Sequence, residues 1–180
     1  MRYFPIFCIL LITTLLLPFG KNKVQHHDFD WKFIETDHFR IYYYQGGGHL
    51  ADFTAEMAER SLERLRKDMM YIPKSKIHVI VYNSHNHFEE TNVMGGIPEE
   101  SVGGFTEFFK NRVVVPYEGN WEGFRHVIHH ELTHAIMNQM LFQGNYQSIV
   151  SGLANMNMPL WFIEGIAEYE SRGGWDSESD

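Results

Sequence analysis

Residues 121–142 read WEGFRHVIHHELTHAIMNQMLF, and this stretch is the most informative part of the 180-residue chain. It predicts one long helix that carries a cluster of histidines. Residues four apart lie on one face of a helix, so the imidazole nitrogens of His130 and His134 can point at one ion. Glu131 follows His130, and its carboxylate can reach water bound to that ion. The spacing predicts two metal ligands and a general base. The alternative is a helix whose histidines are ordinary polar residues.

The rest of the sequence narrows the choice of a third ligand. A histidine six residues after His134 is excluded because Met140 stands there, and the only cysteine, Cys8, lies in an apolar N-terminal run. A carboxylate on a second predicted helix, residues 159–171, or just after it is the remaining choice. The acids in this region are Glu164, Glu168, Glu170 and Asp176.

Glu164 is the favoured carboxylate because of its neighbours. It follows the apolar run Pro159-Leu160-Trp161-Phe162-Ile163 and precedes Gly165. An acid in such a turn is costly to bury unless it meets a positive partner, and a zinc ion is one. Gly165 would let this helix approach the histidine helix closely. We therefore predict one Zn²⁺ per chain, held by His130, His134 and Glu164. The alternative is a carboxylate that interacts only with the dipole of its helix.

Three further residues are candidates for supporting the metal ligands or for contacting a substrate. Glu168 lies one helical turn after Glu164, and His126 lies one turn before His130, each on the same face as the ligand. Glu168 either orients a ligand histidine or is solvated. His126 either contacts substrate or the ligands, or is an ordinary polar histidine. Tyr169, next to Glu168, is the third candidate.

Hydrophobic periodicity predicts the remaining elements. Residues 31–44 alternate as one strand, and apolar residues at spacings of three and four predict a helix over 49–71. A short apolar run predicts a buried strand over 77–82, and a helical turn is expected near Phe88. Two strands, 103–109 and 111–116, are predicted to form a hairpin that turns at Lys110 and Asn111. Residues 144–158 are predicted to form a loop.

Charge and the N-terminus limit the class of partner. The formal net charge is −8 and no basic stripe is present, so a nucleic-acid-binding surface is excluded. Residues 1–20 combine Arg2 with an apolar run and are predicted to be a signal peptide, with a retained membrane anchor as the alternative. Residues 21–30 form an extended lead-in. The expected location is outside the cell, in the periplasm or in the envelope, and a membrane is involved only through an uncleaved signal segment.

At this point the sequence resembles a known group. The segments His130-Glu131-Leu132-Thr133-His134 and Trp161-Phe162-Ile163-Glu164-Gly165-Ile166-Ala167-Glu168-Tyr169 look like those of gluzincin metallopeptidases of the peptidase MA-like superfamily. The upstream segments 103–107 and 111–116 are similar to secreted bacterial domains of that type, some of which continue into a β-propeller. The resemblance covers roughly residues 30–178.

The resemblance implies a fold, an activity and a substrate. The fold would be α+β and zincin-like, with a small mixed sheet, a helix carrying the His-Glu-x-x-His motif and a second helix carrying Glu164. The activity would be zinc-dependent hydrolysis of a peptide or protein, with Glu131 as general base. The strand near Gly103, Gly104 and Phe105 resembles the cleft-edge strand of zincins, which pairs with an extended substrate; an ordinary sheet strand is the alternative.

Two departures from the group affect the domain assignment. The segment between His134 and Glu164 is longer than in the aminopeptidases, and the chain stops soon after Glu164, where the superfamily usually has a further helical lobe. Residues 31–180 are therefore expected to be either a minimal domain or one that lacks this lobe. The alternative function is a non-catalytic zinc-binding module, or an envelope interaction domain of a longer propeller-containing protein.

Overall fold

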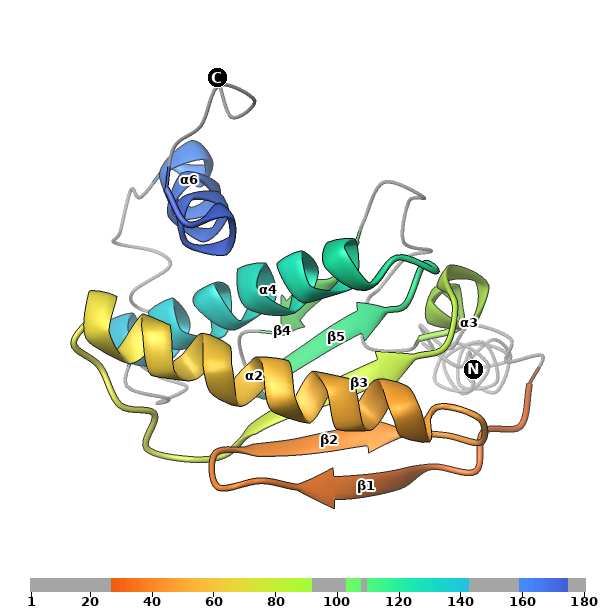
Figure 1. The fold of residues 1–180 in the computed structure, drawn as a ribbon. Coiled ribbons are helices and arrows are strands. Elements are labelled where there is room, and N and C mark those ends of the chain that lie inside the picture. The colour runs from red at the N-terminus through yellow and green to blue at the C-terminus, as the bar shows by residue number, and fades with distance from the viewer. Residues whose placement is uncertain (1–26, 92–102, 108–109, 143–158, 175–180) are drawn as a thin grey trace, which may run out of the picture.

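The computed structural model describes residues 27–91, 103–107, 110–142 and 159–174. The predicted signal peptide, lead-in residues 21–26, the predicted loop 144–158 and the tail 175–180 lie outside the described residues. The described chain is a mixed α+β fold, with a small mixed sheet covered on one face by helices (Figure 1). This confirms the α+β class with a mixed sheet.

The sheet has five strands in the order β1-β2-β3-β5-β4. The two outer pairs, β1 with β2 and β4 with β5, are antiparallel, and β2, β3 and β5 run parallel to one another. Parallel neighbours need a long crossover connection, and here each crossover includes a helix. The strands are β1 Lys32–Glu35, β2 Phe39–Tyr43, β3 Ile77–Tyr82, β4 Phe105–Glu107 and β5 Arg112–Pro116.

The prediction of a single strand over residues 31–44 is wrong. The segment is a hairpin, in which β1 and β2 pair through a tight turn at residues 36–38. The turn closes because the main-chain N–H of Phe39 donates to the Thr36 hydroxyl at 3.0 Å, while the Thr36 N–H donates to the Phe39 carbonyl. The turn falls on Thr36, Asp37 and His38, which with Glu35 make a polar run that the single-strand prediction overlooked. The predicted hairpin of β4 and β5 is confirmed, with Asn111 at a φ of 50° in its turn.

The described helices are α2 Gly48–Asp68, α3 His85–Glu89, α4 Trp121–Phe142 and α6 Leu160–Arg172. Helix α4 has the predicted bounds. Helix α2 ends three residues earlier than predicted, because the chain turns away at Met70, which has a φ of 49°. Helix α6 follows Pro159, which is its extended N-cap rather than its first helical residue, and ends at Gly173 in the left-handed conformation that glycine allows.

The main core lies between the sheet and the pair α2 and α4, which run side by side over one face (Figure 1). Alternate residues of the parallel strands, such as Ile41, Val79 and Val113, are fully buried against apolar residues of these helices. Burial of this kind stabilises a fold by roughly 25 cal/mol per Å² of apolar surface. Among the described helices, none is long and apolar enough to span a membrane.

The fold brings two elements to the histidine face of α4. Helix α6 packs on the side of α4 that faces away from the sheet (Figure 1). Strand β4, the terminal strand of the described sheet, contacts α4 from the sheet side. The predicted packing of the Glu164 helix on the histidine helix is confirmed. Residues that are distant in the sequence therefore meet in one place.

Candidate metal centre

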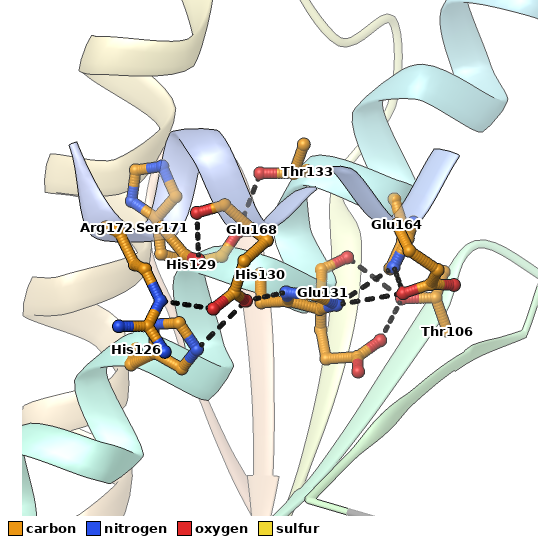
Figure 2. A network of polar contacts seen from close by, with 11 residues as sticks. Thr106, His126, His129, His130, Glu131, Thr133, Glu164, Glu168, Ser171 and Arg172 are labelled. Atoms are coloured by element: carbon orange, nitrogen blue, oxygen red, sulfur yellow. Dashed lines mark hydrogen bonds and ion pairs between the residues drawn. The ribbon is translucent and has the colours of Figure 1, made fainter. Parts of the chain in front are cut away.

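The site consists of two facing rows of side chains, one on α4 and one on α6. Residues four apart share a helix face, and both rows use that spacing (Figure 2). The row on α4 is His126, His130 and His134, and the row on α6 is Glu164, Glu168 and Arg172. The rows run in opposite directions, so His134 lies opposite Glu164 and His126 lies opposite Glu168.

The inner part of the site brings together the three predicted ligands. The Nε2 atoms of His130 and His134 are 3.2 Å apart, and the Oε2 atom of Glu164 lies 3.4 Å from each of them. Burial lowers the pKa of His134, which favours the neutral ring that a metal ion requires. Two imidazole nitrogens and one carboxylate oxygen, each with a lone pair that can bind a metal ion, therefore lie around one point.

The donor set passes a geometric test for a metal ion. Tetrahedral coordination with bonds of about 2.0–2.2 Å separates the ligand atoms by about 3.3–3.6 Å, and the three observed separations are 3.2, 3.4 and 3.4 Å. Hydrogen bonding explains the arrangement less well, because two facing imidazole nitrogens can share only one proton. The three groups are geometrically able to bind one metal ion.

The burial argument that singled out Glu164 is wrong, although the residue is well placed. Its side chain is 49% exposed, and Leu160, Trp161 and Phe162 of the same turn are also exposed. Glu164 therefore incurs little desolvation cost in the absence of an ion. Its position is explained by the packing of α6 on α4, which directs the carboxylate toward the two imidazoles.

Glu131 lies beside the three donors and is almost fully buried, with 7% exposure. Its side chain lines the same pocket as the donors. Burial raises the pKa of Glu131 to about 7, although the hydroxyl of Thr106 acts in the opposite direction by donating to Glu131 Oε2 at 2.8 Å. A carboxyl group with such a pKa can exchange protons near neutral pH.

The outer part of the site joins His126, Glu168 and Arg172. The Oε2 atom of Glu168 lies 3.4 Å from His126 Nε2 and 3.4 Å from His130 Nδ1, and the guanidinium of Arg172 contacts the other carboxylate oxygen. Burial acts to raise the pKa of Glu168, but Arg172 and His126 outweigh it and the pKa is lowered. Glu168 is thus a charged carboxylate that faces Nδ1 of His130, whose Nε2 is one of the three candidate donors.

These outer groups also have the spacing of metal ligands, but two features disfavour a second ion there. Arg172 already neutralises Glu168. His130 also needs its proton on Nδ1 when Nε2 binds a metal ion, and the Glu168 carboxylate lies 3.4 Å from that nitrogen, at ion-pair distance. The contacts suit Glu168 as a partner that fixes the ring of His130.

An open pocket of about 570 Å³ surrounds the site. The predicted edge-strand residues Gly103, Gly104 and Phe105 line it, together with apolar residues of α4 and α6, namely Val127, Leu160 and Ile163. Strand β4 is the terminal strand of the sheet among the described residues. Tyr169 lies elsewhere: it is 41% exposed and lines a separate hollow with Trp161 and Phe162.

The structure adds contacts that the sequence did not indicate. Thr106 bonds to Glu131 although 25 positions separate them, and Arg172 pairs with Glu168. Arg172 had a signal, because it stands at four-residue spacing after Glu168 on one helix. Thr106 had none, because its contact depends on where β4 crosses α4.

Comparisons of the chain with protein-family models, with curated proteins and with solved structures found no match. The functional assignment therefore depends on the geometry of the site.

Proposed function

We propose that this protein is a zinc-dependent peptide hydrolase with a zincin-like fold. The observation that carries the proposal is the convergence of three metal-ligand atoms beside a buried carboxyl group in one open pocket. His130, His134 and Glu164 supply the ligands, and Glu131 supplies the carboxyl group. Metal-assisted hydrolysis needs three things: ligands that hold the metal ion, a general base beside it, and an open pocket that admits the substrate.

Zinc is the proposed metal because of the donor types and their number. Two imidazole nitrogens and one carboxylate oxygen are a donor set used by catalytic zinc, which keeps a further position for water or substrate. A zinc ion bound there would supply a Lewis acid that polarises a carbonyl group and makes water more acidic. The chain would bind one ion, since the Glu168 carboxylate in the outer part of the site already forms an ion pair with Arg172.

Glu131 is the proposed general base. It takes a proton from the attacking water molecule and passes it to the nitrogen of the leaving amine. Burial raises its pKa to about 7. A carboxyl group with a pKa near neutral pH can take up a proton as a base and then release it as an acid. Glu168 and Arg172 hold the ring of His130 in place from the outer side.

The proposed substrate is an extended peptide segment. Strand β4 is the terminal strand of the sheet among the described residues and lies beside the pocket, so an extended substrate would pair with its outer edge. Gly103 and Gly104, which precede the strand, line the same pocket. The predicted signal segment supports a location outside the cell or in its envelope.

The replacement of Glu131 by Gln tests the proposal. The wild-type chain and Glu131→Gln should each bind close to one zinc ion, and only the wild type should cleave members of a peptide library. The matched control is Glu122→Gln, whose side chain is 86% exposed at the start of α4; it should keep full activity. Equal cleavage by Glu131→Gln would refute the base role. Zinc binding without cleavage by the wild type would favour a non-catalytic zinc-binding module.

A further inference from the structure

Thr106, on strand β4, makes two contacts with Glu131 on α4. Its hydroxyl lies 2.8 Å from the carboxylate oxygen Oε2 and 2.9 Å from the main-chain carbonyl oxygen of the same residue. Among the described residues, Thr106 is the only one whose side chain hydrogen bonds to the Glu131 carboxylate (Figure 2). A flexible acid is thus held at its far end by a group from another element.

The close approach of β4 to α4 depends on Gly104. A Cβ atom at this position would lie 3.1 Å from Cγ of Glu131, 3.0 Å from Cγ1 of Val127 and 3.1 Å from the carbonyl oxygen of Val114. These distances are tighter than ordinary Cβ contacts, so a larger residue would require its neighbours, the Glu131 side chain among them, to shift by a few tenths of an ångström. The backbone near Gly104 therefore confines the stem of Glu131, while Thr106 holds its carboxylate.

The hydroxyl of Thr106 suits both protonation states of a general base. A hydroxyl has one hydrogen and two acceptor lone pairs. When Glu131 is charged, the hydrogen is donated to Oε2, which is the stronger acceptor. When Glu131 has taken a proton, it can donate to Thr106, whose own hydrogen then turns to the Glu131 carbonyl at 2.9 Å. Neither state requires the carboxyl group to move.

We propose that Thr106 is a positioning residue that holds the Glu131 carboxyl group in its reactive orientation, with Gly104 as the point where the strand meets the stem of the same side chain. The inference rests on the proposed hydrolase function. It assigns Thr106 no contact with the metal ion or with the reacting atoms. Its effect is therefore on the rate of the chemical step rather than on metal affinity.

A kinetic comparison of three variants tests this role. Thr106→Val removes the hydroxyl at nearly constant volume, and we expect kcat to fall about a hundredfold with KM and zinc content nearly unchanged, since a misplaced catalytic group has an effect of this order. Thr106→Ser restores the hydroxyl and should recover most of kcat. The control is Thr133→Val, which loses a hydroxyl bond of 2.9 Å to the His129 carbonyl on the same helix and should keep kcat.

A crystal structure of Thr106→Val gives a readout that does not need activity. The Glu131 side chain should leave its position or occupy several rotamers in this variant, and it should be ordered in Thr106→Ser and Thr133→Val. An unmoved Glu131 in Thr106→Val would overturn the inference, as would equal kcat values for Thr106→Val and Thr133→Val. An inactive wild type would refute the hydrolase function, whereas the positioning of Glu131 would still be decided by the crystal structure.

Discussion

Removal of the Glu164 carboxylate should weaken metal binding without unfolding the protein. The variant Glu164→Ala removes one of three donors, whose oxygen lies 3.4 Å from each histidine Nε2. Apparent binding free energies of about 10–16 kcal/mol for four-ligand zinc sites correspond to roughly 2.5–4 kcal/mol per ligand. We therefore expect zinc affinity to fall by about two to three orders of magnitude, since about 1.4 kcal/mol is a factor of ten.

The measurement is a competition titration against a chromogenic zinc chelator, with circular dichroism as the check on folding. Because the Glu164 side chain is 49% exposed, its loss should change the free energy of unfolding of the metal-free chain by no more than about 0.5 kcal/mol. Glu63→Ala, an acid with 73% side-chain exposure on α2, is the matched control and should bind zinc like the wild type. An affinity of folded Glu164→Ala within about threefold of the wild type would refute the three-ligand assignment.

Three further outcomes follow from the same contacts. Burial lowers the pKa of His129 to about 4, against about 6.5 in an unfolded chain. The unfolded state then binds more protons at this histidine between these values, so His129 should lower the free energy of unfolding of the metal-free chain by about 2–3 kcal/mol as the pH drops from 6.5 to 4, while the raised pKa of Glu131 acts in the opposite direction. Urea unfolding at several pH values should show this slope reduced in His129→Gln. Zinc at a hundred times its Kd should raise the free energy of unfolding by about 2.7 kcal/mol, and thermal melts of His134→Ala should show no such gain. Leu160→Lys places a charge in the pocket at a residue that is 71% exposed, so kcat/KM for apolar peptides should fall roughly tenfold. Trp161→Lys, at a neighbour that is 74% exposed and lines the other hollow, should leave kcat/KM unchanged, and equal effects would contradict the pocket assignment.

The sequence was sufficient to identify three groups that the structure brings within metal-binding distance of one another, because local geometry fixes most of their arrangement. The four-residue spacing places His130 and His134 on one face of any helix, and the absence of other donor types left a carboxylate as the third ligand. Glu164 was singled out on the expectation that it is buried, but its side chain is half exposed. Exposure of a helix face depends on which elements cover it, and sequence patterns do not supply that information.

The contact between Thr106 and Glu131 and the hairpin of β1 and β2 were not predicted from the sequence. Thr106 meets Glu131 because of the register between β4 and β5 and because Gly104 allows a close approach. The hairpin of β1 and β2 was missed because the alternating segments before and after residues 36–38 were joined across a polar run, Glu35 to His38, where side-chain and main-chain hydrogen bonds reverse the chain. Periodicity reports which face of an element is apolar, but it does not report where the chain turns back.

Anomalous diffraction at the zinc edge, from crystals of the zinc-loaded chain, tests the central claim most directly. The claim predicts one strong peak at about 2.0–2.2 Å from Nε2 of His130, Nε2 of His134 and Oε2 of Glu164. A peak between His126 and Glu168 instead, or a zinc-loaded crystal with no peak at the three predicted donors, would contradict it.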